Sequence, residues 1–178
     1  MIITLLANGF EEIEALTPVD ILRRAGLKVL TCGITGATVT GSHGIEVKAD
    51  LLPDDVNLGE VEMVILPGGM PGSTNIDAHP FTDKIIEAVL KNNGRIAAIC
   101  AAPLVLGRRG LLDGKEAICY PGFECELKGA IISSRSVVTD KNITTAKGMG
   151  VALEFSKELV KLLLGEEKAR EISLAIME

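Results

Sequence analysis

Cys100 stands between two contrasting segments, and this position favours a reactive thiol. The preceding segment, Arg95–Ile99, is mostly apolar and predicts a buried strand, while Pro103 suits the first turn of a helix. A sharp strand-to-helix turn exposes the residue at its apex, as in the nucleophile elbow of serine hydrolases. The small Ala101 and Ala102 let the helix start lie close to the strand, so that its N–H groups favour a thiolate. We therefore predict that Cys100 is a nucleophile and the one strongly acidic thiol of the chain; the alternative is a small buried hydrophobic residue.

Glu14 is the acidic residue best suited to act with this cysteine. It follows a predicted first strand, residues 2–7, and lies one turn into a predicted helix, where Pro18 cannot donate to its carbonyl and so loosens the helix. A carboxyl group buried near a thiolate has a raised pKa and, once protonated, can donate to sulfur or move protons. The alternative is that Glu11, Glu12 and Glu14 only favour the positive end of the helix dipole. That alternative explains the first two better than Glu14.

A glycine pair, Gly68 and Gly69, follows the predicted strand Met63–Leu66. One interpretation pairs the N–H of Gly69 with the N–H of Ala101 as an oxyanion hole, for a hemithioacetal oxygen or an oxygen on oxidised sulfur. The other interpretation is an ordinary tight turn. Neither glycine-rich phosphate-binding pattern is present, and no phosphate-cradling loop follows the first strand, which argues against a flavin carrier.

The other cysteines and the two histidines carry weaker signals. Cys32, Cys119 and Cys125 form no CxxC pair and have no zinc spacing, so neither a disulfide framework nor a metal site is predicted. Cys119 and Cys125 could form a redox pair, although two independent thiols beside a turn are the favoured interpretation. His43 and His79 fall in a predicted turn and loop, and no sequence argument places either beside the reactive cysteine.

Alternating strands and helices must position these residues. Strands are predicted at residues 2–7, 28–33, 38–40, 45–49, 63–66, 95–99, 116–119, 137–139 and 142–145, and helices at residues 11–25, 81–92, 103–109, 148–164 and 166–177. The segments at 38–40 and 45–49 are expected to pair antiparallel, and residues 53–62 to form a polar linker. The pattern predicts a parallel α/β sandwich. Because ligands bind at the carboxyl ends of parallel strands, the first strand, Met63–Leu66 and Arg95–Ile99 must open on one edge.

Composition limits the class of protein. The length of 178 residues favours a single domain over residues 1–178, and 47% hydrophobic with 3% aromatic residues indicates an aliphatic core. A net charge of −6 without a basic run argues against nucleic acid and anionic membranes as partners. The first seven residues are too short for a signal or a membrane span, and no segment approaches 18 consecutive apolar residues. A soluble, cytoplasmic protein is expected.

Taken together, these features resemble the ThiJ/PfpI superfamily, and in particular its DJ-one/YajL-like branch. The resemblance covers nearly the whole chain and is carried by residues 9–14, 18–20, 23–26, 66–69, 97–103 and 144–148. It implies a flavodoxin-like (Rossmann-type) sandwich with a mainly parallel sheet, helices on both faces and a cysteine nucleophile elbow, usually in a homodimer. It also implies that Cys100 oxidises readily to a sulfinate held by a protonated glutamate, the position matched by Glu14.

Members of this superfamily are described as redox sensors, chaperones, cofactor-free glyoxalases that form lactate from methylglyoxal, and protein deglycases. The resemblance thus implies a cytoplasmic protein of carbonyl and oxidative stress. In that role Cys100 attacks a small α-oxoaldehyde, or its adduct on a glycated protein, without a cofactor. The alternative is a non-catalytic redox-sensing or chaperone-like dimer in which Cys100 oxidises.

Three positions depart from the superfamily pattern. The protease and chaperone branches have a histidine directly after the cysteine, where this chain has Ala101, and this argues against peptidase activity. The DJ-one branch has a histidine ahead of a proline after the next strand, and here Tyr120 takes that place. Its hydroxyl is a candidate for orienting a substrate, as is the backbone of Gly68. Lys147 replaces an arginine, which weakens any bidentate contact with an anion.

Overall fold

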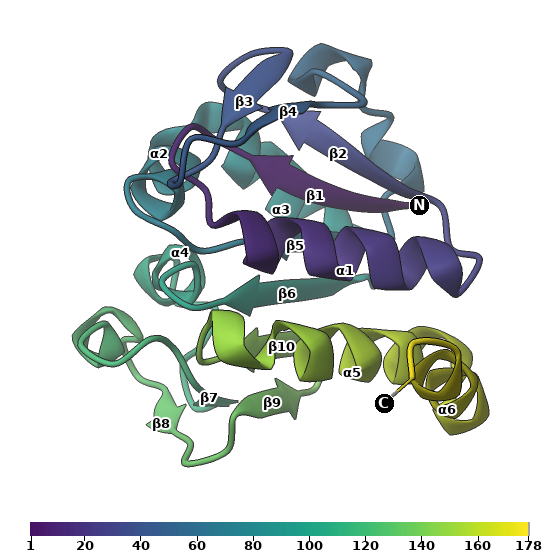
Figure 1. Cartoon of the computed structure of the whole chain (residues 1–178). Helices are drawn as coiled ribbons and strands as arrows, with labels where there is room; N and C mark the ends of the chain where they lie inside the picture. The colour runs from purple at the N-terminus through teal and green to yellow at the C-terminus, as the bar shows by residue number, and fades with distance from the viewer. Residues whose placement is uncertain (178) are drawn as a thin grey trace.

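A six-stranded sheet forms the centre of the computed structural model, which describes residues 1–177 (Figure 1). Its strands, in spatial order, are β2 (Val29–Gly33), β1 (Ile2–Leu6), β5 (Met63–Leu66), β6 (Arg95–Ile99), β10 (Ile143–Ala146) and β9 (Val137–Asp140). Every neighbouring pair is parallel except β9 with β10. The expected mainly parallel sheet is confirmed.

Helices cover both faces of this sheet, as the pattern predicts. The helices are α1 (Glu12–Arg24), α2 (Gly72–Ala78), α3 (Pro80–Lys91), α4 (Pro103–Arg108), α5 (Ala152–Leu164) and α6 (Glu166–Ala175). In Figure 1, α1 and α5 lie side by side in front of the sheet and α3 lies behind it. α6 packs against α5, and α2 packs against α4. The four remaining strands form two small ribbons: β3 (Thr38–Thr40) with β4 (Glu46–Lys48), and β7 (Glu116–Ala117) with β8 (Ile131–Ile132).

The strands are buried on both faces, so successive side chains enter different core layers. On β6, Ile96 and Ala98 join the layer that contains residues of α3 and α4, whereas Ala97 and Ile99 join the layer that contains residues of α1 and α5. β5 alternates in the same way between these two layers. This explains why the central strands read as continuous apolar runs instead of alternating ones.

The register brings the carboxyl ends of three strands to one edge. Leu66 at the end of β5 pairs with Ala98 near the end of β6, and β1 pairs in parallel with β5 on the other side. The segments that follow β1, β5 and β6 therefore meet above the sheet, which confirms the expected common edge.

Several element boundaries differ from the sequence-based prediction. Helix α2 was not predicted, because it is short and its polar, glycine-containing sequence has no apolar period. The helix expected from residue 148 begins as a 3-10 turn, Met149–Val151, and becomes α-helical only at Ala152. The strand expected at residues 116–119 ends at Ala117, and its partner β8 was missed. The expected polar linker at residues 53–62 contains two 3-10 turns, Pro53–Asp55 and Leu58–Glu60.

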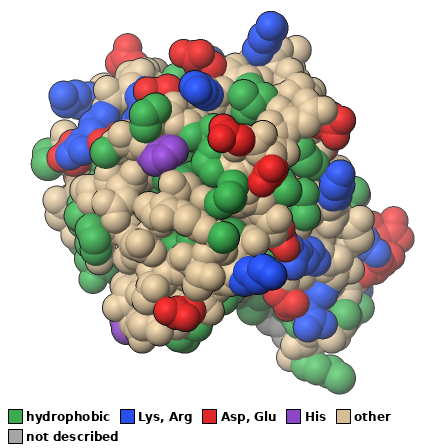
Figure 2. All heavy atoms as spheres, turned by 90° about the horizontal axis from the view of Figure 1, so that it is seen from above, with side chains coloured by type: hydrophobic (Ala, Val, Ile, Leu, Met, Phe, Trp, Pro, Cys, Tyr) green, Lys and Arg blue, Asp and Glu red, His purple; other side chains and the backbone are tan. Residues whose placement is uncertain are grey.

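The surface agrees with the absence of a basic run in the sequence. Figure 2 shows acidic and basic side chains intermixed on one face, with no extended patch of a single charge. Within residues 1–177, no helix has the length and apolar character needed to cross a lipid bilayer.

Candidate active site

Cys100 occupies the apex of a sharp turn between β6 and α4. Its backbone φ is +64°, in the left-handed region that residues other than glycine rarely adopt. Two backbone hydrogen bonds hold it there: its N–H donates to the carbonyl of Ala146 at 2.8 Å, and its carbonyl accepts from the N–H of Tyr120 at 2.7 Å. The elbow predicted from the strand, alanine pair and proline is therefore present, and β10 and the segment after β7 fix it.

Glu14 is buried beside the Cys100 thiol, with only 1% of its surface exposed. One carboxylate oxygen, Oε2, accepts a hydrogen bond of 3.0 Å from the N–H of Gly68. Burial raises the pKa of Glu14 to about 7, the contact with the Cys100 thiol opposes this shift, and the charge of Glu11 adds to it. A carboxyl group with this pKa can accept and return a proton near neutral pH.

The glycine pair allows the loop after β5 to approach both of these residues. A Cβ atom on Gly68 would collide with Glu14 Oε2 and lie 2.6 Å from the Cβ of Cys100. Gly69 has a φ of +86°, and a Cβ there would collide with backbone atoms of Gly9 and Glu11. Glycine is therefore required at both positions because the loop passes so close to its neighbours, and not only because the chain turns there.

Two backbone N–H groups point at the sulfur, those of Gly69 and Ala101. They come from the loop after β5 and from the elbow itself, the pairing that the sequence predicts. Such a pair stabilises negative charge on sulfur or on an oxygen bound beside it.

The thiol of Cys100 is less acidic than its position predicts. Burial raises its pKa to about 12, the Glu14 carboxyl adds to this shift, and the N–H groups of Gly69 and Ala101 oppose it. The prediction of a strongly acidic thiol is wrong, because it counted the helix start but neither the burial of the sulfur nor a carboxylate beside it. Helix α4 also has only six residues, which limits its dipole. Because the thiol and the Glu14 carboxyl are in contact and shift each other's pKa, the two groups titrate as a pair.

The pair lies in a pocket of about 380 Å³ that is lined by apolar residues and by acidic side chains. The lining side chains are Glu11, Glu14, His43, Met70, Cys100, Ala101, Tyr120, Phe123 and Met149, with Gly69 at the base. A larger hollow of about 620 Å³ lies between β9, α5 and α6. None of the residues singled out from the sequence lines it, and charged side chains dominate it. The smaller pocket is the one that contains Cys100 and Glu14.

The sequence pattern that defines the DJ-1/PfpI family matches residues 1–162 of this chain. The chain belongs to the DJ-1/PfpI family.

Relatives in this family match almost the full chain. Protein dj-1beta of Drosophila melanogaster is 33% identical over 98% of this chain and 95% of its own length. Glutathione-independent glyoxalase DJR-1.2 of Caenorhabditis elegans is 31% identical over 96% of this chain and 92% of its own length. The structure of oxidised Toxoplasma gondii DJ-1 superposes with a TM-score of 0.94 at 32% identity, covering 99% of this chain and 97% of that one. The flavodoxin-like fold of DJ-1 proteins is thus the fold of this chain.

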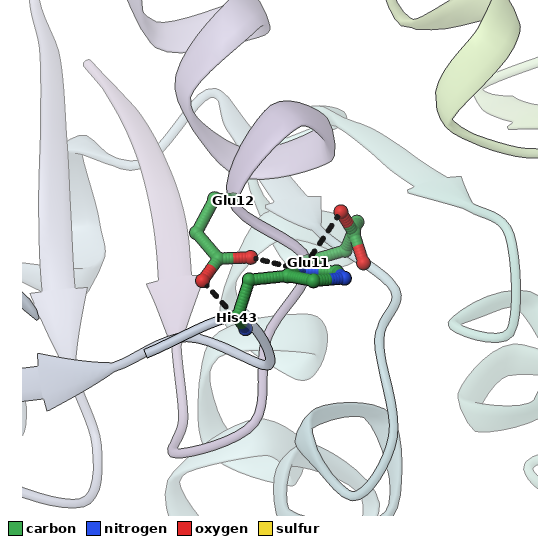
Figure 3. Close-up of side chains that lie close together, drawn as sticks. All are labelled: Glu11, Glu12 and His43. Carbon is green, nitrogen blue, oxygen red and sulfur yellow. Dashed lines mark hydrogen bonds and ion pairs between the residues drawn. The ribbon is translucent and has the colours of Figure 1, made fainter. Parts of the chain in front are cut away.

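His43 lines the pocket, and the sequence did not place it there. It lies in the turn between β3 and β4, which reaches over the start of α1 (Figure 3). Its Nδ1 is 3.0 Å from Oε2 of Glu12 and 3.6 Å from Oε1 of Glu11. Glu12 also accepts from the His43 N–H at 2.8 Å, and from the Ser42 hydroxyl at 3.3 Å.

These contacts show what Glu12 does in the fold. Burial alone raises the pKa of Glu12, but hydrogen bonds from His43 and from backbone N–H groups outweigh it and lower the pKa to about 2. Its carboxylate therefore anchors the turn to the helix. Glu11, Glu12 and His43 could each offer a ligand atom to a cation, but the Glu12 oxygens are already occupied by the turn. In the sequence, only the polar turn between the two short strands hinted at this arrangement. A turn of this kind does not show which distant residues it will contact.

The three residues that depart from the DJ-1/PfpI pattern lie in different surroundings. Ala101 is buried directly after the cysteine. Tyr120 is half exposed and lines the pocket, in the place where the resemblance expects a histidine. Lys147 is exposed after β10, where its N–H donates to the carbonyl of Ser136 at 3.0 Å, and it does not line the pocket.

Proposed function

We propose that this protein is a DJ-1-type protein of carbonyl and oxidative stress, in which Cys100 attacks methylglyoxal or a related small α-oxoaldehyde without a cofactor. One observation carries the proposal. The sulfur has the raised-pKa carboxyl of Glu14 on one side and the N–H groups of Gly69 and Ala101 on the other. The name of the nematode relative, a glutathione-independent glyoxalase, supports this choice of reaction.

In the proposed reaction the sulfur bonds to the aldehyde carbon, and the carbonyl oxygen takes up the charge beside the two N–H groups. Glu14 removes the proton from that carbon and returns it to the neighbouring ketone carbon. The first carbon is thereby oxidised to a thioester and the second reduced to an alcohol, whose hydroxyl keeps the proton of the thiol. Water cleaves the thioester, which releases lactate and restores the thiol. A deglycase uses the same attack on an adduct of the aldehyde with a protein.

The decisive experiment is incubation of the purified protein with methylglyoxal while D- and L-lactate are measured. Lactate formation that disappears in Cys100→Ala supports the proposal, whereas equal rates with and without the protein contradict it.

Light scattering of the same sample tests the homodimer that the family resemblance implies, and fractionation of cells tests the cytoplasmic location.

The second candidate function is a redox sensor without turnover, acting alone or as a chaperone-like dimer. It is favoured by the same contacts, because Glu14 and two N–H groups can also hold the oxygens of an oxidised sulfur. The related Toxoplasma gondii structure is of an oxidised protein. Absence of lactate formation, together with oxidation of Cys100 by peroxide, would favour this candidate.

A further inference from the structure

Acidic side chains outnumber basic ones in and beside the Cys100 pocket. Glu11 and Glu14 line it, and Glu12 lies beside them against His43. Among the lining residues that the structure describes, none is a lysine or arginine, and His43 alone can carry a positive charge. Even a protonated His43 leaves Glu11 and Glu12 with an excess of one negative charge, and a neutral His43 leaves an excess of two.

Glu11 is held so that its charge acts on the interior of the pocket. Its N–H donates to the carbonyl of Gly68 at 2.9 Å, and its carboxylate accepts from the Ser42 hydroxyl at 3.1 Å. Only 15% of its side chain is exposed, which limits screening by water. Burial is the largest cause of the raised pKa of Glu14, and the charge of Glu11 raises this pKa further. The electric field of Glu11 therefore reaches the reacting groups.

The walls and the base of the pocket define the rest of the ligand. Met70, Tyr120, Phe123 and Met149 offer apolar surface for a methyl or short alkyl group. The N–H groups of Gly69 and Ala101 at the sulfur donate hydrogen bonds to the oxygen of the carbonyl group under attack. A carboxylate elsewhere on the ligand finds no lysine or arginine among the described lining residues, and the one possible cation, His43, is already paired with Glu11 and Glu12.

We propose that Glu11 determines specificity by charge: the pocket accepts neutral α-oxoaldehydes and disfavours carbonyl compounds that carry a carboxylate. This inference rests on the proposed function for its substrate class. The selection itself acts on any reagent that reaches the sulfur, so it can be measured without turnover.

Alkylation of Cys100 by iodoacetamide and by iodoacetate provides the test, because the two reagents have similar size and differ by one negative charge. The rate of each is followed on the Cys100 peptide by mass spectrometry. In Glu11→Gln, the rate with iodoacetate relative to iodoacetamide rises by about threefold or more, because one charge at a distance of about 6 Å has an effect of about threefold in bulk water and a larger one where water is partly excluded. A change in the thiol pKa affects both reagents equally, so the ratio isolates the charge of the pocket.

Glu87→Gln is the matched control, because Glu87 is an exposed residue of α3 and loses the same charge. Its ratio stays at the wild-type value. An unchanged ratio in Glu11→Gln overturns the inference, and so does an equal rise in Glu87→Gln, which would show an effect of net charge alone.

A second measurement uses glyoxylate, an anionic aldehyde, as an inhibitor of lactate formation from methylglyoxal. Its inhibition constant, relative to the KM of methylglyoxal, falls by about threefold or more in Glu11→Gln. Absence of lactate in the wild type refutes the proposed function and leaves the alkylation result standing. Lactate formation with unchanged ratios in both measurements refutes charge selection alone.

Discussion

Cys100 and Glu14 depend on each other for their protonation. Burial raises the pKa of both groups, to about 12 for the thiol and about 7 for the carboxyl. The thiol donates to the Glu14 carboxylate, which lowers the pKa of Glu14 and raises that of Cys100. A neutral carboxyl can donate to a thiolate instead, whereas the carboxylate repels it. The reactivity of the cysteine is therefore a property of the pair and of the two N–H groups that face the sulfur.

Substitution of Glu14 separates proton transfer from hydrogen bonding. Glu14→Gln keeps a donor beside the sulfur but cannot carry a proton, so alkylation of Cys100 at pH 8 stays at least as fast as in wild type. Lactate formation falls by about 10²-fold or more, the usual contribution of general acid–base catalysis. Both rates are measured on the same preparations.

Glu14→Leu is the companion variant, because it removes the donor as well as the charge. Its Cys100 thiol reacts more slowly than that of Glu14→Gln. Equal alkylation rates in the two variants would show that Glu14 makes no useful hydrogen bond to sulfur, and unchanged lactate formation in both would remove Glu14 from the mechanism.

Oxidation of Cys100 is expected to stop at the sulfinic acid. The neutral carboxyl of Glu14 and the N–H groups of Gly69 and Ala101 can hold the two oxygens of a sulfinate. After graded treatment with peroxide, mass spectrometry of the Cys100 peptide should show a persistent gain of two oxygen atoms. A gain confined to the exposed Cys125, or progression of Cys100 to three oxygens at the same dose, would contradict this expectation.

At the scale of secondary structure, four segments assemble the site. The elbow between β6 and α4 presents the sulfur, the loop after β5 supplies the glycines, the start of α1 supplies the acids, and the turn between β3 and β4 supplies His43. The first three follow neighbouring parallel strands, so the sheet itself fixes their relative positions. The turn has no such constraint, and Glu12 holds it instead.

Gly68→Ala tests the close approach of the β5 loop to the site. The new Cβ would collide with the Glu14 carboxylate and with Cys100. Glu14 is buried, and backbone hydrogen bonds to Ala146 and Tyr120 hold Cys100, so neither neighbour is free to move. We expect the variant to lose most of its lactate formation and about 1–3 kcal/mol of stability, the usual cost of overpacking.

Gly59→Ala is the control for that variant, because a Cβ there would meet only Asn57 Oδ1 at 3.5 Å. Activity and urea denaturation of both variants are compared with wild type. Full activity in Gly68→Ala would show that the loop can shift away and that the contact with Glu14 does not position the carboxyl.

At the scale of the whole molecule, the raised pKa of Glu14 makes stability depend on pH. The folded state holds the proton up to about pH 7, whereas the unfolded chain releases it near pH 4.5. The contribution of Glu14 is therefore fully present below pH 4.5 and is lost as the pH rises through 7. Relative to Glu14→Gln, the wild type should lose on the order of 3 kcal/mol between these limits.

Urea denaturation of wild type and Glu14→Gln at a series of pH values measures this difference. Other titrating groups are common to both proteins, so they cancel in the comparison. Parallel pH profiles for the two proteins would mean that Glu14 ionises in the folded state as it does in the unfolded chain.

The amino-acid sequence by itself determined that three strands open on one edge and that Cys100 lies in an elbow, and it placed Glu14, Gly69 and Ala101 near the sulfur. These predictions succeeded because apolar periods, glycines and a proline act on neighbouring residues, and because parallel strands must end on one edge. Short elements such as α2 and β8 escaped prediction because packing stabilises them and local preference does not.

Only the tertiary structure decided the acidity of the thiol and the composition of the pocket mouth. The pKa of Cys100 depends on burial and on a carboxyl 86 positions earlier in the chain, which no local pattern reports. His43 reaches the site because Glu12 binds its turn across 31 positions of sequence. Both facts depend on long-range distances, and these exist only once the sheet and its loops have packed.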